Sequence, residues 1–364
     1  MARGTTEQGR YPFKPDYAVP PGRTLSSTLQ ALGIDQKEFA RRTGYTEKHI
    51  SQVMQGKASI TPEAALRFEK VTGVPARLWN NLETQYREQL ALLKSHEKSS
   101  EHLDWLDEIP IKELIKRGAI KKCDSQVEQL EACLGFFGVA EVRAWREGWK
   151  KRHIAFRKSI CHESCDGAIA AWVRLAELQA QALECQPFDD AHFREALLQI
   201  RGLTTKPTDV FVTQMRVLCA AAGVAVALVR EVPKAPISGA ARWLSKSKAM
   251  IALNLRGKAN DRFWFTFFHE AGHILNDDRT EVFVDIDYAD DPREQAANDF
   301  AGEWLIPSTF RAALAGLKSA AAVTEFASEI GIHPGIVAGR LQHDKLVPFT
   351  HFNGLKVKLV WSEG

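Results

Sequence analysis

The sequence is poor in cysteine and lacks any long apolar segment. Its 364 residues include six cysteines, which are spread along the chain and form no pattern typical of a disulfide framework. No apolar run reaches the length of a membrane span, and the first residues lack the hydrophobic core of a secretion signal. We therefore expect a cytoplasmic protein with no membrane attachment. The apolar fraction of 45% and the charged fraction of 26% indicate a globular protein, and the length predicts two or three domains.

The net charge of +3 conceals two regions of opposite sign. Residues 1–75 contain 11 Lys and Arg against 7 Asp and Glu, a net charge of +4. Residues 261–310 contain 3 Lys and Arg against 12 Asp and Glu, a net charge of −9. A basic region favours nucleic acid and an acidic region favours a cation, so the two regions are expected to have different partners.

The acidic region begins with a segment that predicts a metal site. Residues 263–276 read F-W-F-T-F-F-H-E-A-G-H-I-L-N and place His269 and His273 four residues apart, with Glu270 between them. On a helix, side chains four residues apart lie on one face, so both imidazoles can reach one ion. Glu270 is placed to contact a water on that ion. This H-E-x-x-H arrangement is typical of zinc-assisted hydrolysis of a peptide bond.

The surroundings of these histidines predict a buried helix. Nearly all of the remaining residues of this segment are apolar, which predicts burial. A buried polar cluster needs partners, and a metal would supply them. Gly272 disfavours a helix, which indicates that another element approaches closely there. The alternative is a core helix in which the two histidines are merely hydrogen-bonded.

A catalytic zinc normally has three protein ligands, so a third donor is needed. Most of the other downstream carboxylates are expected in a solvated loop between two helices; the full set is Asp277, Asp278, Glu281, Asp285, Asp287, Asp290, Asp291, Asp299 and Glu303. Glu294 differs, because it lies in the first turn of a helix predicted for 292–305, whose small apolar face suits packing on the histidine helix. Asn298 follows one turn later and is a candidate to hydrogen-bond a ligating imidazole.

The N-terminal part predicts a small helical domain. Residues 1–23 are rich in Gly and Pro and predict a flexible arm. Residues 24–93 predict five helices, at 24–32, after Ile34 to Thr43, 47–55, from about Thr61 to Thr72, and from about Ala76 to Leu93.

The second and third of these helices are joined by a short Gly-containing turn and predict a helix-turn-helix. The N-terminal residues of the second helix of this motif enter the DNA major groove. We expect Lys48 to read guanine, Glu47 to accept from cytosine, Gln52 to address adenine and Gln36 to hold a phosphate. The alternative is a helical bundle that binds protein. The full set of candidate DNA-binding residues is Gln36, Thr46, Glu47, Lys48, Ser51 and Gln52.

The rest of the chain predicts a linker or a continued helix at 94–108, a helical middle region at 109–204 and an α+β domain at 205–364. Strands are expected at 224–230, 237–243 and 249–255. The fold class is therefore mainly α with an α+β C-terminal part. Cys161, His162 and Cys165 allow a second zinc site, but no second Cys or His pair lies nearby, and ordinary thiols are the alternative.

Residues 20–93 resemble the HigA-type antitoxin branch of the XRE helix-turn-helix regulators. The resemblance is carried by P-P-G-R-T-L, H-I-S-Q-V-M-Q-G-K, I-T-P-E-A-A-L-R-F-E and L-W-N-N-L-E-T-Q-Y. It implies a homodimer on a double-stranded DNA operator and a possible cognate toxin as partner.

Residues 236–361 resemble the ImmA/IrrE family of metallo-endopeptidases, which is similar to the gluzincins. The resemblance is carried by H-E-A-G-H at 269–273, E-Q-A-A-N-D-F-A-G-E-W-L-I-P at 294–307 and I-H-P-G-I-V-A-G-R-L-Q at 332–342. It implies one Zn²⁺ ion held by His269, His273 and Glu294, with Glu270 as the general base. Tyr288, His333 and His343 are candidates to stabilise the oxyanion, and the sequence does not choose among them.

Both resemblances together predict a DNA-binding regulator that carries its own zinc endopeptidase domain. Its substrate would be a repressor of the helix-turn-helix type or the protein itself, and cleavage would relieve repression. The alternative is a HigA-like antitoxin or repressor from a toxin–antitoxin operon, without peptidase activity.

Overall fold

The computed structural model describes residues 17–153, 166–257, 259–277, 282–284 and 292–361. The chain divides into two compact units, Met1–His102 and Leu103–Gly364. The fold is mainly helical with one small sheet in the second unit, which confirms the predicted fold class. No helix in the described part of the chain has both the length and the apolar character needed to cross a membrane.

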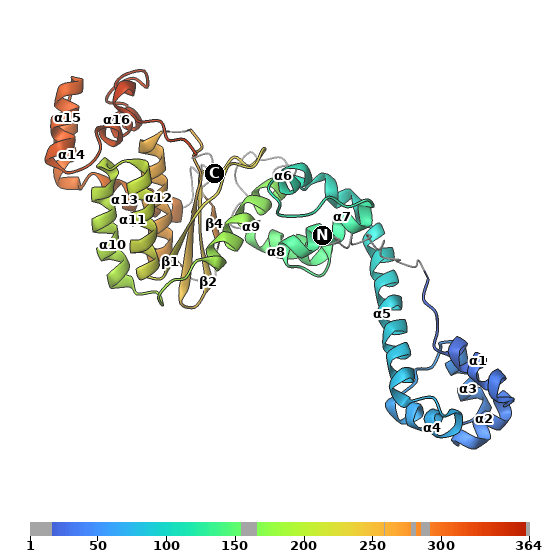
Figure 1. The fold of residues 1–364 in the computed structure, drawn as a ribbon. Coiled ribbons are helices and arrows are strands. Elements are labelled where there is room, and N and C mark those ends of the chain that lie inside the picture. The colour runs from blue at the N-terminus through green and yellow to red at the C-terminus, as the bar shows by residue number, and fades with distance from the viewer. Residues whose placement is uncertain (1–16, 154–165, 258, 278–281, 285–291, 362–364) are drawn as a thin grey trace, which may run out of the picture. The chain divides into compact units, whose positions relative to one another are not determined.

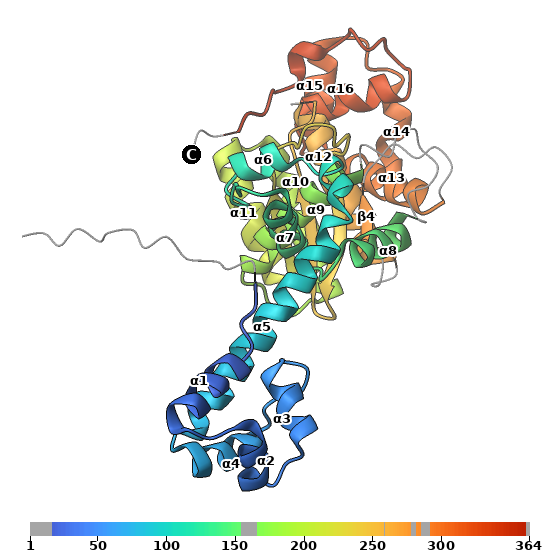
Figure 2. The same cartoon turned by 90° about the vertical axis from the view of Figure 1, so that its right-hand side faces the viewer.

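The described residues of the N-terminal unit form five helices, as predicted. Helices α1 to α4 gather beside the first turns of α5 (Figure 2). Residues 1–16 of the predicted arm lie outside the described residues. The helices are α1 (Gly22–Leu32), α2 (Gln36–Thr43), α3 (Glu47–Met54), α4 (Pro62–Thr72) and α5 (Ala76–Ser100).

Local side-chain hydrogen bonds set the helix-turn-helix formed by α2 and α3. The Asp35 carboxylate accepts from the backbone N–H of Glu38 at 2.7 Å, and the Thr46 hydroxyl accepts from that of His49 at 3.2 Å, so each helix is capped where it begins. Between them, Gly44 adopts a φ of 73°, a left-handed conformation that glycine adopts without strain.

An apolar core holds these helices together. Phe39 lies 5.0 Å from Phe68 and Phe68 lies 6.1 Å from Trp79, measured between ring centroids. Ile50 and Val53 of α3 are buried in the same cluster. Helices α2 and α3 therefore share one core, and the opposite face of α3 is exposed or partly exposed.

The C-terminal unit is built on a four-stranded sheet with the order β1-β3-β2-β4. Strand β1 pairs with β3 in parallel, and β2 pairs with both β3 and β4 in antiparallel. The strands are β1 (Val224–Leu228), β2 (Gly239–Ser245), β3 (Lys248–Leu253) and β4 (Val282–Val284).

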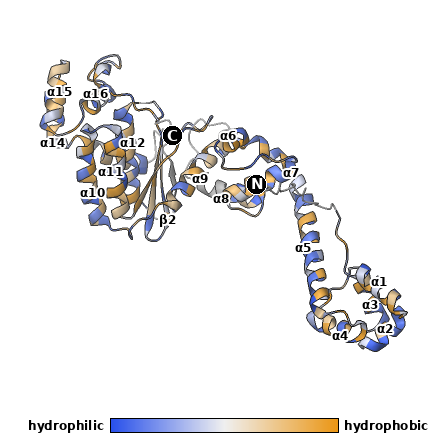
Figure 3. Ribbon diagram, in the orientation of Figure 1, coloured by the Kyte–Doolittle hydropathy of each residue, from blue (hydrophilic) through white to orange (hydrophobic). Residues whose placement is uncertain are grey.

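The alternation of residues along the strands divides the unit into two cores. Val224, Val226 and Ala241 pack in one core with α10, α11 and α12, whereas Ala225 and Ala240 pack in the other with α9. Figure 1 shows α9 on one side of the sheet and α10 to α12 on the other. These helices carry hydrophobic residues beside hydrophilic ones, as amphipathic covering helices do (Figure 3).

The helices of this unit complete both layers. Those before the sheet are α6 (Ile111–Lys116), α7 (Gln126–Phe137), α8 (Val142–His153), α9 (Asp166–Ala182), α10 (Asp190–Gly202) and α11 (Thr208–Ala221). Those after β3 are α12 (Asn260–Asn276), α13 (Pro292–Leu305), α14 (Ser308–Leu314), α15 (Ala320–Glu329) and α16 (Pro334–His343). Short 3₁₀ helices are η1 (Leu103–Asp107), η3 (Leu203–Thr205) and η4 (Asn353–Leu355).

Residues 94–108 were expected to form a linker or a continued helix. Helix α5 continues to Ser100, and Trp105 in η1 is fully buried in the second unit. The described residues of the middle region 109–204 are mainly helical, and its helices α9 and α10 cover opposite faces of the sheet. The limits of the family domains remain predictions.

Candidate functional site

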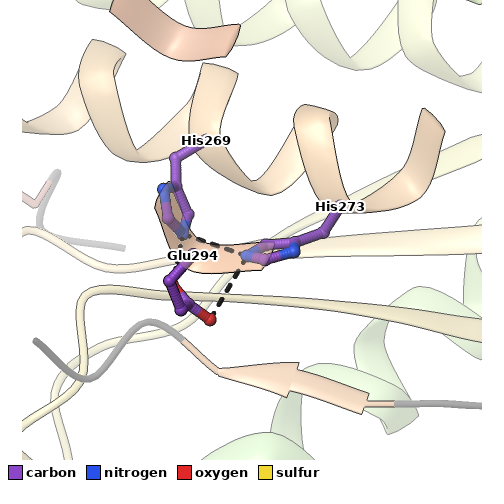
Figure 4. A group of neighbouring side chains, drawn as sticks. All are labelled: His269, His273 and Glu294. Carbon is purple, nitrogen blue, oxygen red and sulfur yellow. Dashed lines mark hydrogen bonds and ion pairs between the residues drawn. The ribbon is translucent and has the colours of Figure 1, made fainter. Parts of the chain in front are cut away.

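The site is built on α12, which is buried on almost every side. Its aromatic side chains Phe263, Trp264, Phe267 and Phe268 are all 5% exposed or less and fix the helix against the sheet and neighbouring helices. This packing places His269 and His273 on one face, toward Glu294 of α13 (Figure 4). The expectation of a buried helix is confirmed.

Three donor atoms converge at this face. The Nε2 atoms of His269 and His273 lie 3.1 Å apart. The Glu294 carboxylate lies 3.1 Å from the first nitrogen and 3.5 Å from the second. All three side chains are buried, and their donor atoms lie within 4.8 Å of one another.

Close packing of α12 and α13 makes this convergence possible. A Cβ at Gly272 would lie 3.3 Å from the Cα of Ala297 and 3.2 Å from a ring carbon of Phe300. Gly272 therefore lies at a close contact between α12 and α13, as the sequence predicted for this position. A larger residue would push α13, and Glu294 with it, away from the histidines.

Each histidine is oriented by a second residue at its other ring nitrogen. The Nδ1 of His269 lies 3.0 Å from the Asn298 side-chain oxygen, and the Nδ1 of His273 lies 2.5 Å from an Asp277 oxygen. Because both partners are acceptors, each Nδ1 donates, and each Nε2 of a neutral ring is left to face the common centre. The structure thus places Asn298 where the sequence predicted.

The ionisable side chains at the site shift one another's pKa values. Burial opposes a charged imidazole, but hydrogen bonds to Asp277 and Glu294 outweigh it and raise the pKa of His273 to about 10. Burial also opposes a charged carboxylate, but hydrogen bonds from His269 and His273 lower the pKa of Glu294 to about 2. The carboxylates therefore stabilise positive charge at the centre of the site.

Glu270 is fully buried and lies against the start of β2. A Cβ on Gly239 would lie 2.5 Å from a Glu270 carboxylate oxygen and 2.5 Å from a Thr266 methyl carbon. The absence of a side chain at Gly239 therefore defines the space in which the Glu270 carboxylate lies. The charge of Glu270 also contributes to the raised pKa of His273, after burial and the two hydrogen bonds.

The donor set fits a zinc ion. Ligand atoms about 2.1 Å from a tetrahedral ion lie about 3.4 Å from one another, close to the observed separations. Two imidazoles and one carboxylate are the protein ligands of one common class of catalytic zinc site. The Nε2 pair and the Glu294 carboxylate would hold the ion, with Asn298 and Asp277 behind the two rings.

Two of the three residues considered for the oxyanion lie in described parts of the chain. His333 accepts from the N–H of Gly335 and lies 2.9 Å from Asn260, so it caps α16 beside the first residue of α12. His343 is exposed, with its Nδ1 3.1 Å from an Asp344 oxygen. Tyr288 lies outside the described residues, and so do Cys161, His162 and Cys165.

Sequence reasoning missed Asp277 and Gly239. Asp277 was expected in a solvated loop, but its side chain is 11% exposed and packs on His273. Its position four residues after His273 was the available signal, because it continues the same helix face. Gly239 gave no signal, since only the fold brings β2 to Glu270.

The candidate DNA-binding residues lie on or beside α3. Thr46, Glu47 and Lys48 are exposed at its N-terminal end, whereas Gln36, Ser51 and Gln52 are partly exposed. The Gln36 amide donates to the Glu47 carbonyl oxygen at 3.2 Å, so it links α2 to the start of α3. The Ser51 hydroxyl accepts from Gln55 at 3.2 Å.

Comparisons with known proteins match the N-terminal and C-terminal parts of the chain to two different families. Residues 25–79 match the helix-turn-helix family, and residues 226–342 match the IrrE N-terminal-like domain of the M78 peptidases. Over 66 residues the chain is 32% identical to the uncharacterized HTH-type transcriptional regulator YddM of Escherichia coli strain K12, covering 18% of this chain and 70% of that protein.

Two solved structures are also similar to part of the chain. A putative antidote protein of a plasmid maintenance system from Nostoc punctiforme is 33% identical, with 23% of this chain and 91% of that chain covered and a TM-score of 0.22. An addiction module antidote protein of the HigA family from Coxiella burnetii is 28% identical, with coverage of 23% and 94% and a TM-score of 0.22.

The match at 226–342 contains His269, His273 and Glu294, and the match at 25–79 contains all of α2 and α3. The chain therefore belongs to the helix-turn-helix transcriptional regulators through its N-terminal unit, and it carries an M78 peptidase domain of the IrrE N-terminal-like type in its C-terminal unit.

Proposed function

We propose that this protein is a DNA-binding regulator whose second unit is an active zinc endopeptidase. The convergence of His269, His273 and Glu294, with Glu270 buried one residue after the first histidine, supports this proposal most strongly. In the M78 domain, such a site gives the chain the groups that peptide hydrolysis requires.

The chain's own residues divide the chemistry among them. When bound, zinc would supply Lewis-acid chemistry that polarises the scissile carbonyl and acidifies a water molecule. Glu270 accepts the proton of the attacking water and returns it to the leaving amine. Asn298 and Asp277 keep the two imidazoles in the orientation that leaves each Nε2 facing the centre.

The sheet offers a route for the substrate chain. Among the described strands, β4 lies at one edge and pairs with β2, whose first residue packs against Glu270. An extended peptide that adds to this edge would gain main-chain hydrogen bonds before cleavage. The substrate we propose is a helix-turn-helix repressor, which includes this protein's own N-terminal unit.

The test is cleavage in solution. The zinc-loaded protein is incubated alone and with candidate helix-turn-helix repressors, and the products are identified by mass spectrometry. We expect discrete cleavage that Glu270→Gln slows by about 10²-fold to 10⁴-fold while zinc remains bound. Undiminished cleavage by Glu270→Gln would contradict the role of Glu270, and no cleavage of any candidate would contradict the peptidase proposal.

A second function is a repressor or antitoxin that needs no peptidase activity. The observation in its favour is that residues 1–102 form a compact unit with a core of their own. The cheap discriminating observation is whether a small toxin gene lies beside this one. If the protein is such an antitoxin, the Glu270→Gln variant would still bind the operator as a homodimer and neutralise the toxin.

A further inference from the structure

A small hollow lies one helix turn from Glu270, at the N-terminal end of α12. Thr266 joins this hollow to the catalytic centre, because a Cβ on Gly239 would lie 2.5 Å from both Thr266 and Glu270. The volume of the hollow is about 10 Å³, too small for a separate ligand, but the tip of one substrate side chain can enter it. The lining residues are Ser238, Asn254, Leu255, Arg256, Ala259, Arg262, Phe263 and Thr266.

Asn254 holds the walls of this hollow in place. It is 5% exposed, and its side-chain amide donates to the Ile237 carbonyl at 2.7 Å while its side-chain oxygen accepts from the Arg256 N–H at 2.8 Å. The backbone N–H of Asn254 donates to the Ser238 carbonyl at 3.0 Å. These bonds tie the start of β2 to the segment after β3, so the backbone at Arg256 has a fixed place beside the catalytic centre.

A glycine lets Arg262 lie along the same wall. Gly257 has a φ of 82°, in the left-handed region that glycine adopts without strain. A Cβ at this position would lie 3.0 Å from the Cδ and 3.0 Å from the Nη1 of Arg262. The Arg262 side chain therefore packs on the backbone at Gly257, directly after Arg256 in the chain.

The two arginines make the hollow positive. Its described lining residues include no acidic side chain, and within the described part of the chain neither guanidinium has a hydrogen bond or an ion pair. The neighbouring Asp261 is buried and pairs with Lys356 at 2.6 Å instead. Arg262 also lies in the first turn of α12, where the helix dipole disfavours a cation. A carboxylate in the hollow would give both exposed guanidinium groups a partner.

We propose that this hollow is a specificity site of the peptidase and takes an Asp or Glu side chain of the substrate. The inference rests on the proposed endopeptidase function, which it deepens. Arg262 precedes Glu270 by eight residues, which is about 12 Å along the helix. An extended peptide spans about 3.3 Å per residue, so the acidic side chain lies within about four residues of the cleaved bond.

The first test is cleavage by the full-length, zinc-loaded protein. Overlapping synthetic peptides that cover helix-turn-helix repressors, this protein's N-terminal unit included, are incubated with it and analysed by mass spectrometry. Each cleaved peptide is then made again with its acidic residues replaced by Asn or Gln. We expect Asp or Glu near the cut, and a kcat/KM that is about fivefold to tenfold lower for the neutral peptide. This ratio should decrease at high salt. Cleavage with no preference for acidic residues would overturn the specificity site and leave the peptidase proposal intact.

Charge reversal locates the preference. The double variant Arg256→Glu with Arg262→Glu should lose the preference for acidic residues and favour Lys or Arg at the same place in the peptide. The matched control is Lys206→Glu with Lys318→Glu, which changes the net charge equally at two exposed positions that do not line the hollow. If both double variants change the preference equally, the two arginines do not recognise the substrate.

Binding to the Glu270→Gln variant separates this inference from the proposed function. The same acidic and neutral peptides are titrated by fluorescence anisotropy against Glu270→Gln protein, with and without the two arginine reversals. If the natural protein cuts nothing, acid-dependent binding that the reversals abolish would support the specificity site and contradict the peptidase. Absence of cleavage together with equal binding of acidic and neutral peptides would overturn both.

Discussion

At the scale of single residues, the metal centre depends on side chains that would not touch the ion. His269 and His273 converge because Asn298 and Asp277 hold their other ring nitrogens. Without these acceptors, each ring could rotate or adopt the other tautomer, and the shared centre would be lost in part. The affinity for zinc should therefore depend partly on Asn298 and Asp277.

This dependence predicts the effect of Asn298→Ala. The variant keeps the three candidate ligands but removes the acceptor from His269, so zinc affinity should fall by about 10-fold to 100-fold. Competition with a chelator of known affinity measures the change. The control is Gln295→Ala, which should leave zinc affinity unchanged. It removes an exposed side chain of the same helix, which hydrogen-bonds to Asp299. Equal affinities of the natural protein and Asn298→Ala would contradict the orienting role.

Gly239 should separate zinc binding from cleavage. The added Cβ of Gly239→Ala would lie 2.5 Å from a Glu270 oxygen, so the carboxylate must move. A displacement of about 1 Å at a catalytic group can cost about 10²-fold in rate. We expect cleavage to fall by about that factor while zinc content stays that of the natural protein, since no candidate ligand is touched. A variant with unchanged cleavage would show that Glu270 acts from another position.

At the scale of elements, the helix-turn-helix presents the first turn of α3 to its partner. Lys48 is exposed there, directly after the capped start of the helix. Lys48→Ala should weaken DNA binding, and the dependence of binding on salt should decrease by about one counterion if the lysine meets phosphate. If it reads guanine, the loss should be confined to the specific site and amount to about 1–3 kcal/mol.

The matched control for this prediction is Lys94→Ala. It removes the same charge from an exposed position of α5, about 27 Å along the helix from Ala76. Fluorescence anisotropy with DNA from upstream of the protein's own gene and with unrelated DNA would measure both variants. If Lys48→Ala and Lys94→Ala weaken binding equally, α3 is not the recognition helix.

Local signals predicted the elements better than the contacts between them. The helices predicted after Ile34 to Thr43 and at 47–55 match α2 and α3 almost to the residue, because the observed caps at Asp35 and Thr46 and the turn at Gly44 are local features of the sequence. Strand β4, with three residues, is too short to show alternation, and it depends on pairing with β2. The sequence also did not predict α14 and α15 as separate helices.

The candidate site shows the same limit. His269, Glu270 and His273 could be predicted because one helix turn brings them together, and the small apolar face of α13 pointed to Glu294. The approach of Gly239 to Glu270 joins residues 31 positions apart in the chain. Such contacts depend on tertiary packing, which periodicity does not encode.

At the scale of the whole molecule, each unit has a core of its own. The core around Phe68 and Trp79 stabilises residues 1–102, and two cores on either side of the sheet stabilise residues 103–364. We therefore predict two thermal transitions in calorimetry. Removal of zinc should lower only the transition of the second unit, which loses about 2.7 kcal/mol for zinc at 100 times its Kd. A single transition that shifts as a whole would contradict this independence.

The most direct test of the central proposal is metal analysis of the purified protein with and without Glu294→Ala. The natural protein should retain about one zinc ion per chain after dialysis, because three buried donors converge on one centre. Glu294→Ala should lose most of that zinc, while Glu303→Ala, an exposed acid on the same helix, should retain it. Absence of zinc from the natural protein, or full retention by Glu294→Ala, would contradict the metal centre proposed here.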